Sequence, residues 1–230
     1  MCQYLGVGRA GFLGIARHNR SQHFCCMIKA LLLLLEPMGA WDRIVQARRG
    51  VVHVLFVFLL PLLALGAVAE GTGLVHWGEP QKEFRQLKKF PVREAVIFET
   101  SQAVLSIAIV FIGASILKSL GETFHGRHSF TQTFTTVAYG LSPLFALRVL
   151  DAFPGLHPWL GWGMGILLSL KVLYQGIPRV MMPDPPHAFG LYLTSSFLLV
   201  LITGLARFVT AWYLEGRFES IQEFISGAAG

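Results

Sequence analysis

The chain has 230 residues, of which 53% are hydrophobic and only 14% are charged. Soluble domains carry about 25% charged residues, so this composition argues against a water-soluble globular protein and predicts an all-α, polytopic membrane helix bundle. The formal net charge of +6 favours contact with anionic lipid head groups over nucleic-acid binding, which needs a dense basic face.

The first 26 residues differ from the remainder of the chain. Residues 1–26 are rich in Gly, Arg and His and have no sustained apolar period. Met27 then opens a Leu-rich run, so we expect 1–26 to be a disordered extension or an over-long gene model. A signal peptide is the competing interpretation, disfavoured because the Leu run closes at Pro37 without a small-residue cleavage site. All three cysteines lie in 1–26 and match no finger pattern, so no disulfide framework and no metal site are predicted.

Residues 27–50 are predicted to form an amphipathic segment that lies at the membrane interface. Pro37 suits the first position of a helix, and Met38, Trp41 and Val45 then follow helical spacing with polar residues opposite them. The alternative is a soluble helix that binds a partner. At the interface, three bases of this segment are expected to contact anionic lipid head groups: Arg43, Arg48 and Arg49.

Five apolar stretches are long enough to cross the roughly 30 Å apolar core of a bilayer. Pro61 lies in the first stretch and Pro143 in the third, so we expect both spans to be kinked or broken. An odd number of spans puts the termini on opposite sides, and the distribution of Lys and Arg slightly favours a cytoplasmic N-terminus. A short tail, 215–230, follows this 51–214 membrane domain. The expected spans are 51–69, 96–120, 131–153, 157–177 and 189–214.

The polar connection from Glu70 to Glu94 is the longest between two spans. Phe84, Leu87 and Phe90 recur at three-residue intervals among its bases, which predicts a second short interfacial helix whose bases reach lipid phosphates. A solvated loop is the alternative. The bases expected to contact lipid are Lys82, Arg85, Lys88 and Lys89.

Charged residues in or at the edges of the spans form a candidate polar site. Each would cost about 2.5–3.5 kcal/mol if central and unpaired, so we expect them to face the interior, pair or snorkel. Arg148 and Asp151 are three residues apart and are predicted to pair on one helix face. Two interpretations remain open, a solute pathway and structural pairing that fixes helix register. The charged residues concerned are Glu99, Arg148, Asp151, Lys171 and Arg207.

The segment from Lys171 to His187 joins the fourth and fifth spans. Its glycine and prolines predict that no helix crosses it, with the fourth span leaving the membrane at Gly176-Ile-Pro178. Gly161 and Gly165, earlier in the fourth span, form a pattern that lets two helix backbones approach closely, within the bundle or between two copies.

Together these features resemble the Yip-domain family of Ypt/Rab-interacting, five-helix integral membrane proteins, and the chain is similar to its bacterial members. The resemblance covers about Met27 to Leu214. It implies no catalytic residues and no cofactor. Eukaryotic members are linked to vesicle trafficking, membrane shaping and prenylated small GTPases, usually through a long N-terminal cytosolic region. We expect no such region here. The residues that carry the resemblance include Pro37, Trp41, Tyr174, Gly176, Pro178 and Met182.

We therefore expect a non-enzymatic protein of the bacterial cytoplasmic membrane that acts through lipid or protein partners. The sequence contains no nucleophile–base set and no phosphate-cradling Gly loop, and it predicts no cofactor. The alternative is a small permease or channel component that uses the intramembrane charges, favoured by the proline-broken spans and disfavoured by the lack of an internal repeat. A third hypothesis is an intramembrane enzyme built from His53, His76 and Glu99, which share no motif.

Overall fold

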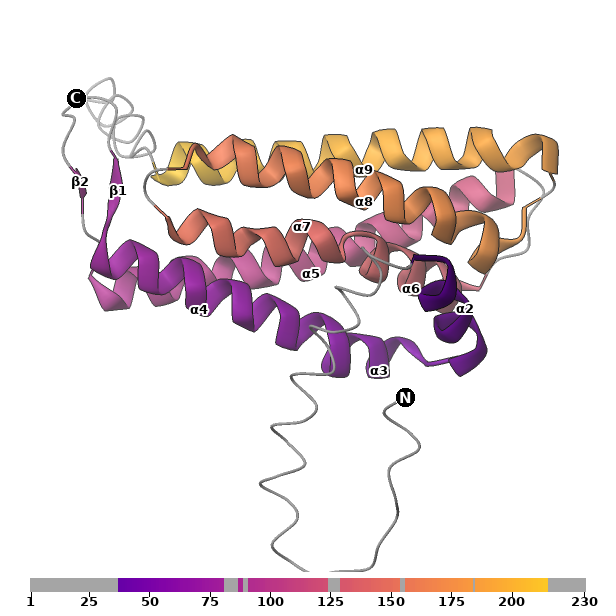
Figure 1. Ribbon diagram of the computed structural model, residues 1–230, viewed down its shortest axis with the longest axis horizontal. Helices are drawn as coiled ribbons and strands as arrows, with labels where there is room; N and C mark the ends of the chain where they lie inside the picture. The colour runs from indigo at the N-terminus through magenta and orange to yellow at the C-terminus, as the bar shows by residue number, and fades with distance from the viewer. Residues whose placement is uncertain are drawn as a thin grey trace, which may run out of the picture.

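The computed structural model describes residues 37–80, 87–88, 91–123, 129–153, 156–183 and 185–214. Five helical stretches in these residues are long and apolar enough to cross a membrane, and they lie side by side along one long axis (Figure 1). The predicted all-α membrane bundle is therefore confirmed. The five stretches are Val51–His76, Val92–Thr123, Phe130–Ala152, Trp159–Met181 and Pro186–Tyr213.

The first span is one helical stretch with an irregular turn near its proline. It comprises α3 (Val51–Val54), a π-helical turn (Leu55–Leu59) and α4 (Leu60–His76). Pro61 has no N–H for the bond that an α-helix would make four residues back, and the wider π turn lies directly before it. The helix then continues to His76, so Glu70 is inside the span rather than at the start of a loop.

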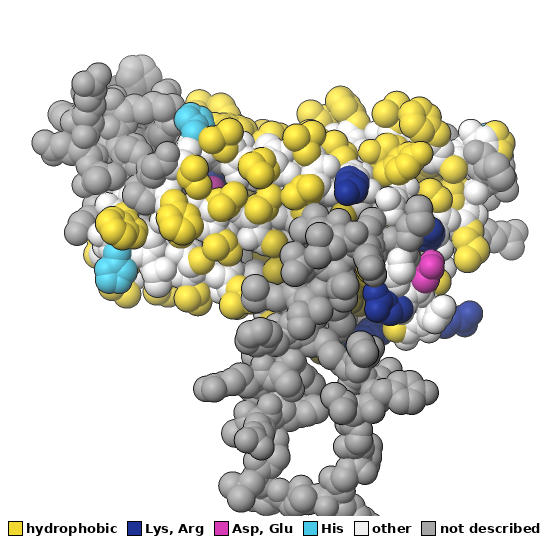
Figure 2. Space-filling model, in the orientation of Figure 1, with side chains coloured by type: hydrophobic (Ala, Val, Ile, Leu, Met, Phe, Trp, Pro, Cys, Tyr) yellow, Lys and Arg dark blue, Asp and Glu magenta, His cyan; other side chains and the backbone are white. Residues whose placement is uncertain are grey.

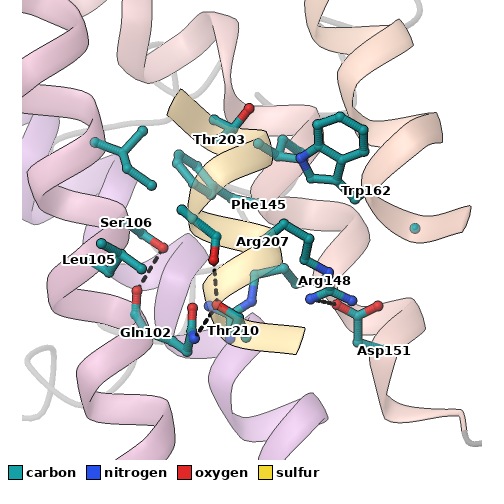
Figure 3. A pocket seen from close by; sticks show the side chains of 14 residues that line it. Gln102, Leu105, Ser106, Phe145, Arg148, Asp151, Trp162, Thr203, Arg207 and Thr210 are labelled. Atoms are coloured by element: carbon teal, nitrogen blue, oxygen red, sulfur yellow. Dashed lines mark hydrogen bonds and ion pairs between the residues drawn. The ribbon is translucent and has the colours of Figure 1, made fainter. Parts of the chain in front are cut away.

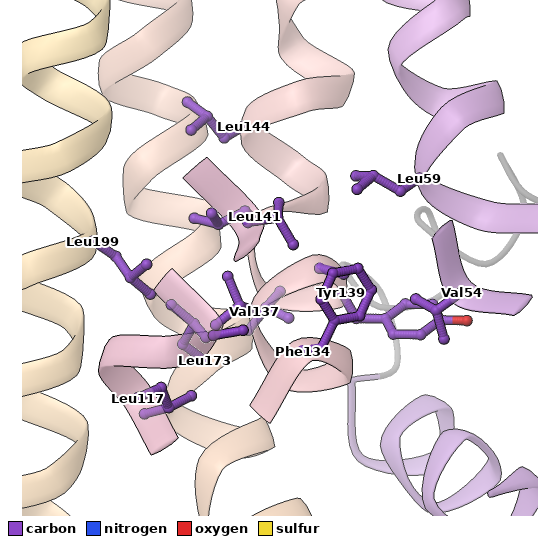
Figure 4. Packing of buried hydrophobic residues seen from close by; sticks show 14 of the residues in the cluster. Val54, Leu59, Leu117, Phe134, Val137, Tyr139, Leu141, Leu144, Leu173 and Leu199 are labelled. Atoms are coloured by element: carbon purple, nitrogen blue, oxygen red, sulfur yellow. The ribbon is translucent and has the colours of Figure 1, made fainter. Parts of the chain in front are cut away.

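The third span is broken, and it is the central element of the bundle. It comprises α6 (Phe130–Gly140), α7 (Ser142–Leu147) and a 3₁₀-helix, η2 (Arg148–Ala152). Leu141 separates the first two helices, and Pro143 lies in the first turn of α7, where its missing N–H is tolerated. Of its 18-residue apolar window 72% is buried, against 28% to 44% for the other spans. The other four spans therefore pack around it, as the buried side chains in Figure 4 show.

The predicted amphipathic helix is present as α2 (Pro37–Ala47). Trp41, however, is 0% exposed and its indole Nε1 donates a hydrogen bond to the carbonyl oxygen of Val172 at 3.1 Å. Asp42 pairs with Arg179 at 3.6 Å. Protein therefore covers Trp41, and α2 is docked on the bundle (Figure 1).

The connection after the first span contains two short strands, β1 (Glu79–Pro80) and β2 (Leu87–Lys88), which pair antiparallel at the end of the bundle away from α2 (Figure 1). The interfacial helix predicted here is therefore wrong at Leu87–Lys88, where the backbone is extended. The bases Lys82, Arg85 and Lys89 lie outside the described residues. The second span, α5 (Val92–Thr123), follows.

The fourth span, α8 (Pro158–Met181), runs past the point where it was predicted to end. Pro178 lies inside its last turn, and the helix stops at Met182, whose backbone is left-handed (φ 42°) and whose N–H bonds to the carbonyl oxygen of Pro178 at 3.1 Å. The end predicted at Gly176-Ile-Pro178 is thus wrong by about one turn. The fifth span, α9, covers Pro185–Leu214.

Candidate functional site

A buried ion cluster joins three spans near the end of the bundle that carries the strands. Arg148 of η2 donates to Glu70 Oε2 of α4 from both Nε (3.0 Å) and Nη2 (2.6 Å). Its Nη2 also donates to Glu99 Oε2 of α5 at 3.0 Å. Glu70 is 2% exposed and Glu99 is 7% exposed. One guanidinium therefore holds two carboxylates from different helices, in a place where removing any partner would leave a buried charge.

Small residues let the third span approach close enough for this contact. Gly66, Glu70 and Gly73 are spaced four and three residues apart, so they share one face of α4. A Cβ added at Gly73 would lie 2.6 Å from the carbonyl oxygen of Ala152, and one at Gly66 would lie 3.6 Å from the Cβ of Arg148. The glycines thus set the distance between α4 and η2 over which Arg148 reaches Glu70.

Replacing Gly73 by Ala is expected to lower the free energy of unfolding by about 1–3 kcal/mol, because its Cβ would collide with the backbone of Ala152. The direction of this change in the free energy of unfolding is informative, since replacing Gly by Ala inside a helix ordinarily stabilises by up to about 1 kcal/mol. Detergent-titrated unfolding measures it. Gly163→Ala is the matched control, because nothing lies within 4 Å of a Cβ there. If both variants are equally stable, the close approach of α4 to η2 does not constrain the fold.

A second ion pair lies beside the first. Arg207 of α9 contacts Asp151 of η2, with 3.0 Å between Nη1 and Oδ2, and both side chains are largely buried. The predicted pairing of Arg148 with Asp151 is therefore wrong. Glu70 and Glu99 bind Arg148 from neighbouring helices, and Arg207 binds Asp151 from α9. Contacts between helices therefore take the place of the predicted contact between Arg148 and Asp151 within one helix.

Four of the five charged residues singled out from the sequence thus come together: Glu99, Arg148, Asp151 and Arg207. Glu70 completes the cluster and was missed, because Glu70-Gly-Thr-Gly73 has the composition of a loop. The helical spacing of Gly66, Glu70 and Gly73 was the signal that could have placed Glu70 in a span.

A small polar pocket adjoins the cluster, walled by α5, α8, α9 and the end of the third span (Figure 3). Gln102 Nε2 donates to Thr210 Oγ1 at 2.7 Å, and Arg148, Asp151 and Arg207 line the pocket. Its volume of about 60 Å³ would admit a few water molecules. It is far below the roughly 300–1,000 Å³ of small-molecule sites, so this pocket does not suit a small organic substrate.

Lys171, the remaining charged candidate, lies elsewhere. It is exposed on α8, one residue from the midpoint (residue 170) of the span Trp159–Met181. Neither an ion pair nor a hydrogen bond of its side chain occurs within the described part of the chain. A lone cation at the centre of a span costs about 2.5–3.5 kcal/mol, so this position needs an explanation from outside the bundle.

The remaining candidates belong to the joint between α8 and α9. Gly176 is buried against Trp41, whose Cε2 would lie 2.6 Å from an added Cβ. Tyr174 is exposed and packs edge-on against Tyr192, with ring centroids 5.2 Å apart. Pro178 is exposed within α8. Tyr174 and Pro178 both line a pocket of about 340 Å³ between α8 and the start of α9, together with Arg179 and Phe189, whereas Gly176 faces α2.

The glycine pair of the fourth span packs within the chain. An added Cβ at Gly165 would lie 2.9 Å from the Cα of Leu144, and one at Gly161 would lie 3.2 Å from Asp151 Oδ1. This face is filled by the third span. Self-association through Gly161 and Gly165 is therefore not available in this arrangement.

The residues of the enzyme hypothesis do not meet. His53 and His76 lie near opposite ends of the first span, and 23 residues at about 1.5 Å each put them roughly 35 Å apart. His53 instead bonds to Arg49, with 2.8 Å between the two nitrogens. Within the described ranges there is also no group of three His, Cys, Asp or Glu able to hold a metal ion.

Five apolar helices around a charge-paired interior define an integral, multi-pass membrane protein. A family model described as the Yip1 domain matches residues 31–208, which is more than half of the chain, and the chain belongs to the Yip1 domain family. The family membership predicted from the sequence is thus confirmed. No curated protein and no solved structure matches the chain.

Proposed function

We propose that this Yip1-domain protein is non-enzymatic and acts through lipid or protein partners at its outer surface, in a membrane-organising or trafficking-like role. The observation that carries the proposal is the pairing of the internal charges. Glu70, Glu99 and Asp151 each contact an arginine, and the adjoining pocket has only about 60 Å³. The interior therefore suits helix assembly better than substrate handling.

The protein is placed by this proposal in the bacterial cytoplasmic membrane, and the distribution of charge favours an N-terminus on the cytoplasmic side. Hydrophobic side chains cover most of the described surface in Figure 2, and Lys and Arg gather at the α2 end. Arg43 and Arg48 are exposed there, within reach of anionic head groups, as bases on the cytoplasmic side of a membrane commonly are.

Purified full-length protein in sealed liposomes is expected to give no proton or cation flux above that of empty liposomes. Crosslinking in native membranes is expected to capture partners on the outer surface. Flux of a screened solute would overturn the proposal in favour of its alternative.

That alternative is a small permease or channel component, favoured by the contact of Arg207 and Asp151 with the polar pocket. In that case Arg207→Met and Lys171→Met should abolish the flux. Loss of flux in the Arg207 variant counts only where its yield in the membrane matches that of the unmodified protein.

A further inference from the structure

Six exposed residues of α8 form one continuous stripe, which we call the α8 seam. Its members are spaced alternately four and three residues apart, the spacing of a helix that packs lengthwise against another helix. All of them are exposed. The α8 seam consists of Leu160, Met164, Leu167, Lys171, Tyr174 and Pro178.

Lys171 distinguishes this stripe from the lipid-facing stripes that any membrane bundle has. The exposed stripe of α9 is apolar where it crosses the membrane, with Leu193, Phe197 and Leu201. Ten residues separate Lys171 from Met181 at the end of α8, a distance of about 15 Å along the axis. A four-carbon stem does not cover that distance, so snorkelling alone does not bring the ammonium to the lipid phosphates.

We propose that the α8 seam binds a transmembrane helix of another protein, one that carries an Asp or Glu at the depth of Lys171. A buried carboxylate opposite Lys171 would neutralise the charge where lipid tails cannot. A single polar residue in an otherwise apolar seam also fixes the register and the choice of partner. The inference rests on the proposed function, because it names the kind of partner that the outer surface holds.

A second copy of the chain fits this role poorly. Among the described residues, the carboxylates within the spans, Glu70, Glu99 and Asp151, already bind arginines inside the bundle. The exposed carboxylates lie in α2 or in the terminal turns of α5: Asp42, Glu94 and Glu122. No described acid of a second copy is therefore placed to meet Lys171 midway through the membrane.

The test uses the full chain in native membranes, with a photo-crosslinking amino acid in place of Leu167, one turn before Lys171. The crosslinked peptide is mapped by mass spectrometry. It is expected to come from an apolar segment of another protein with Asp or Glu within one turn of the crosslink. The same amino acid in place of Leu201 on α9 is the positional control and is expected to capture lipid.

Charge variants then decide the role of Lys171. Lys171→Met should lower the crosslink yield about tenfold, the scale of one polar contact between helices in a membrane, and Lys171→Arg should retain it. Exchanging the charges, with Lys171→Glu and the partner's acid replaced by Lys, should restore it. Since Lys171 is exposed, these variants should reach the membrane in unchanged amounts, which immunoblotting checks.

Capture of a second copy or of lipid alone at position 167 would overturn the inference, as would a partner segment without an acid. A protein crosslink that is insensitive to Lys171→Met would also overturn it while leaving the proposed function intact. Solute flux in the liposome experiment, by contrast, would remove the proposed function itself.

Discussion

Replacing Arg148 by Met is expected to lower the free energy of unfolding by about 3–5 kcal/mol, the cost of leaving buried charge without its partner. Arg148 donates three hydrogen bonds, two to Glu70 and one to Glu99. Without it, two buried carboxylates face each other with no cation between them. Detergent-titrated or steric-trap unfolding in bilayers measures the loss.

The charge variants of the same cluster provide the control. Glu70→Gln and Glu99→Gln, combined with Arg148→Met, should recover much of the lost stability, because a neutral cluster of similar volume avoids the unpaired charge. Lys171→Met, which removes an exposed cation from another span, should leave stability nearly unchanged. If Arg148→Met proves no more costly than Lys171→Met, the cluster does not hold the bundle together.

Placing a methyl group at Gly176 is expected to dislodge α2. In Gly176→Ala the new Cβ would lie 2.6 Å from Trp41 Cε2, and the indole is fully buried. Overpacking of this kind costs about 1–3 kcal/mol. Protease cleavage within α2 should accelerate while the five-span core stays resistant.

A double-mutant cycle isolates this contact. Trp41→Ala alone should cost about 3–5 kcal/mol, as loss of a buried aromatic side chain does. In that background Gly176→Ala should cost little, because the group with which it collides is gone. Gly163→Ala, on the same helix but facing open space, should leave the cleavage of α2 unaltered. Additive costs for Trp41→Ala and Gly176→Ala would contradict the packing described here.

The number of spans could be predicted from the sequence because each is a long apolar run. Their ends were less predictable. A helix continues through polar residues when neighbouring helices supply their hydrogen-bond partners. Arg148 does this for Glu70 within α4. Pro178 likewise lies inside α8, which continues beyond it to Met181.

The partners within the candidate site could not be predicted, because they depend on which helices become neighbours. Spacing along the chain favoured Arg148 with Asp151, whereas the bundle places Glu70 and Glu99 around Arg148 and Arg207 beside Asp151. The docking of Trp41 could not be predicted for a related reason. Its amphipathic pattern identifies an apolar face, but the surface at Gly176 that receives the indole belongs to residues more than a hundred positions away.

The broken third span has a consequence for biosynthesis. This span carries Arg148 and Asp151 in its final turns and is interrupted at Leu141, so it is a poor candidate to enter a bilayer by itself. The chain order compensates. Glu70 and Glu99, in the first two spans, are synthesised before Arg148 and can pair with it as soon as it leaves the ribosome. Asp151, by contrast, can pair with Arg207 only after the fifth span has been synthesised. We therefore expect the first three spans to assemble as a unit, with the fifth completing the protein as the last part to be inserted.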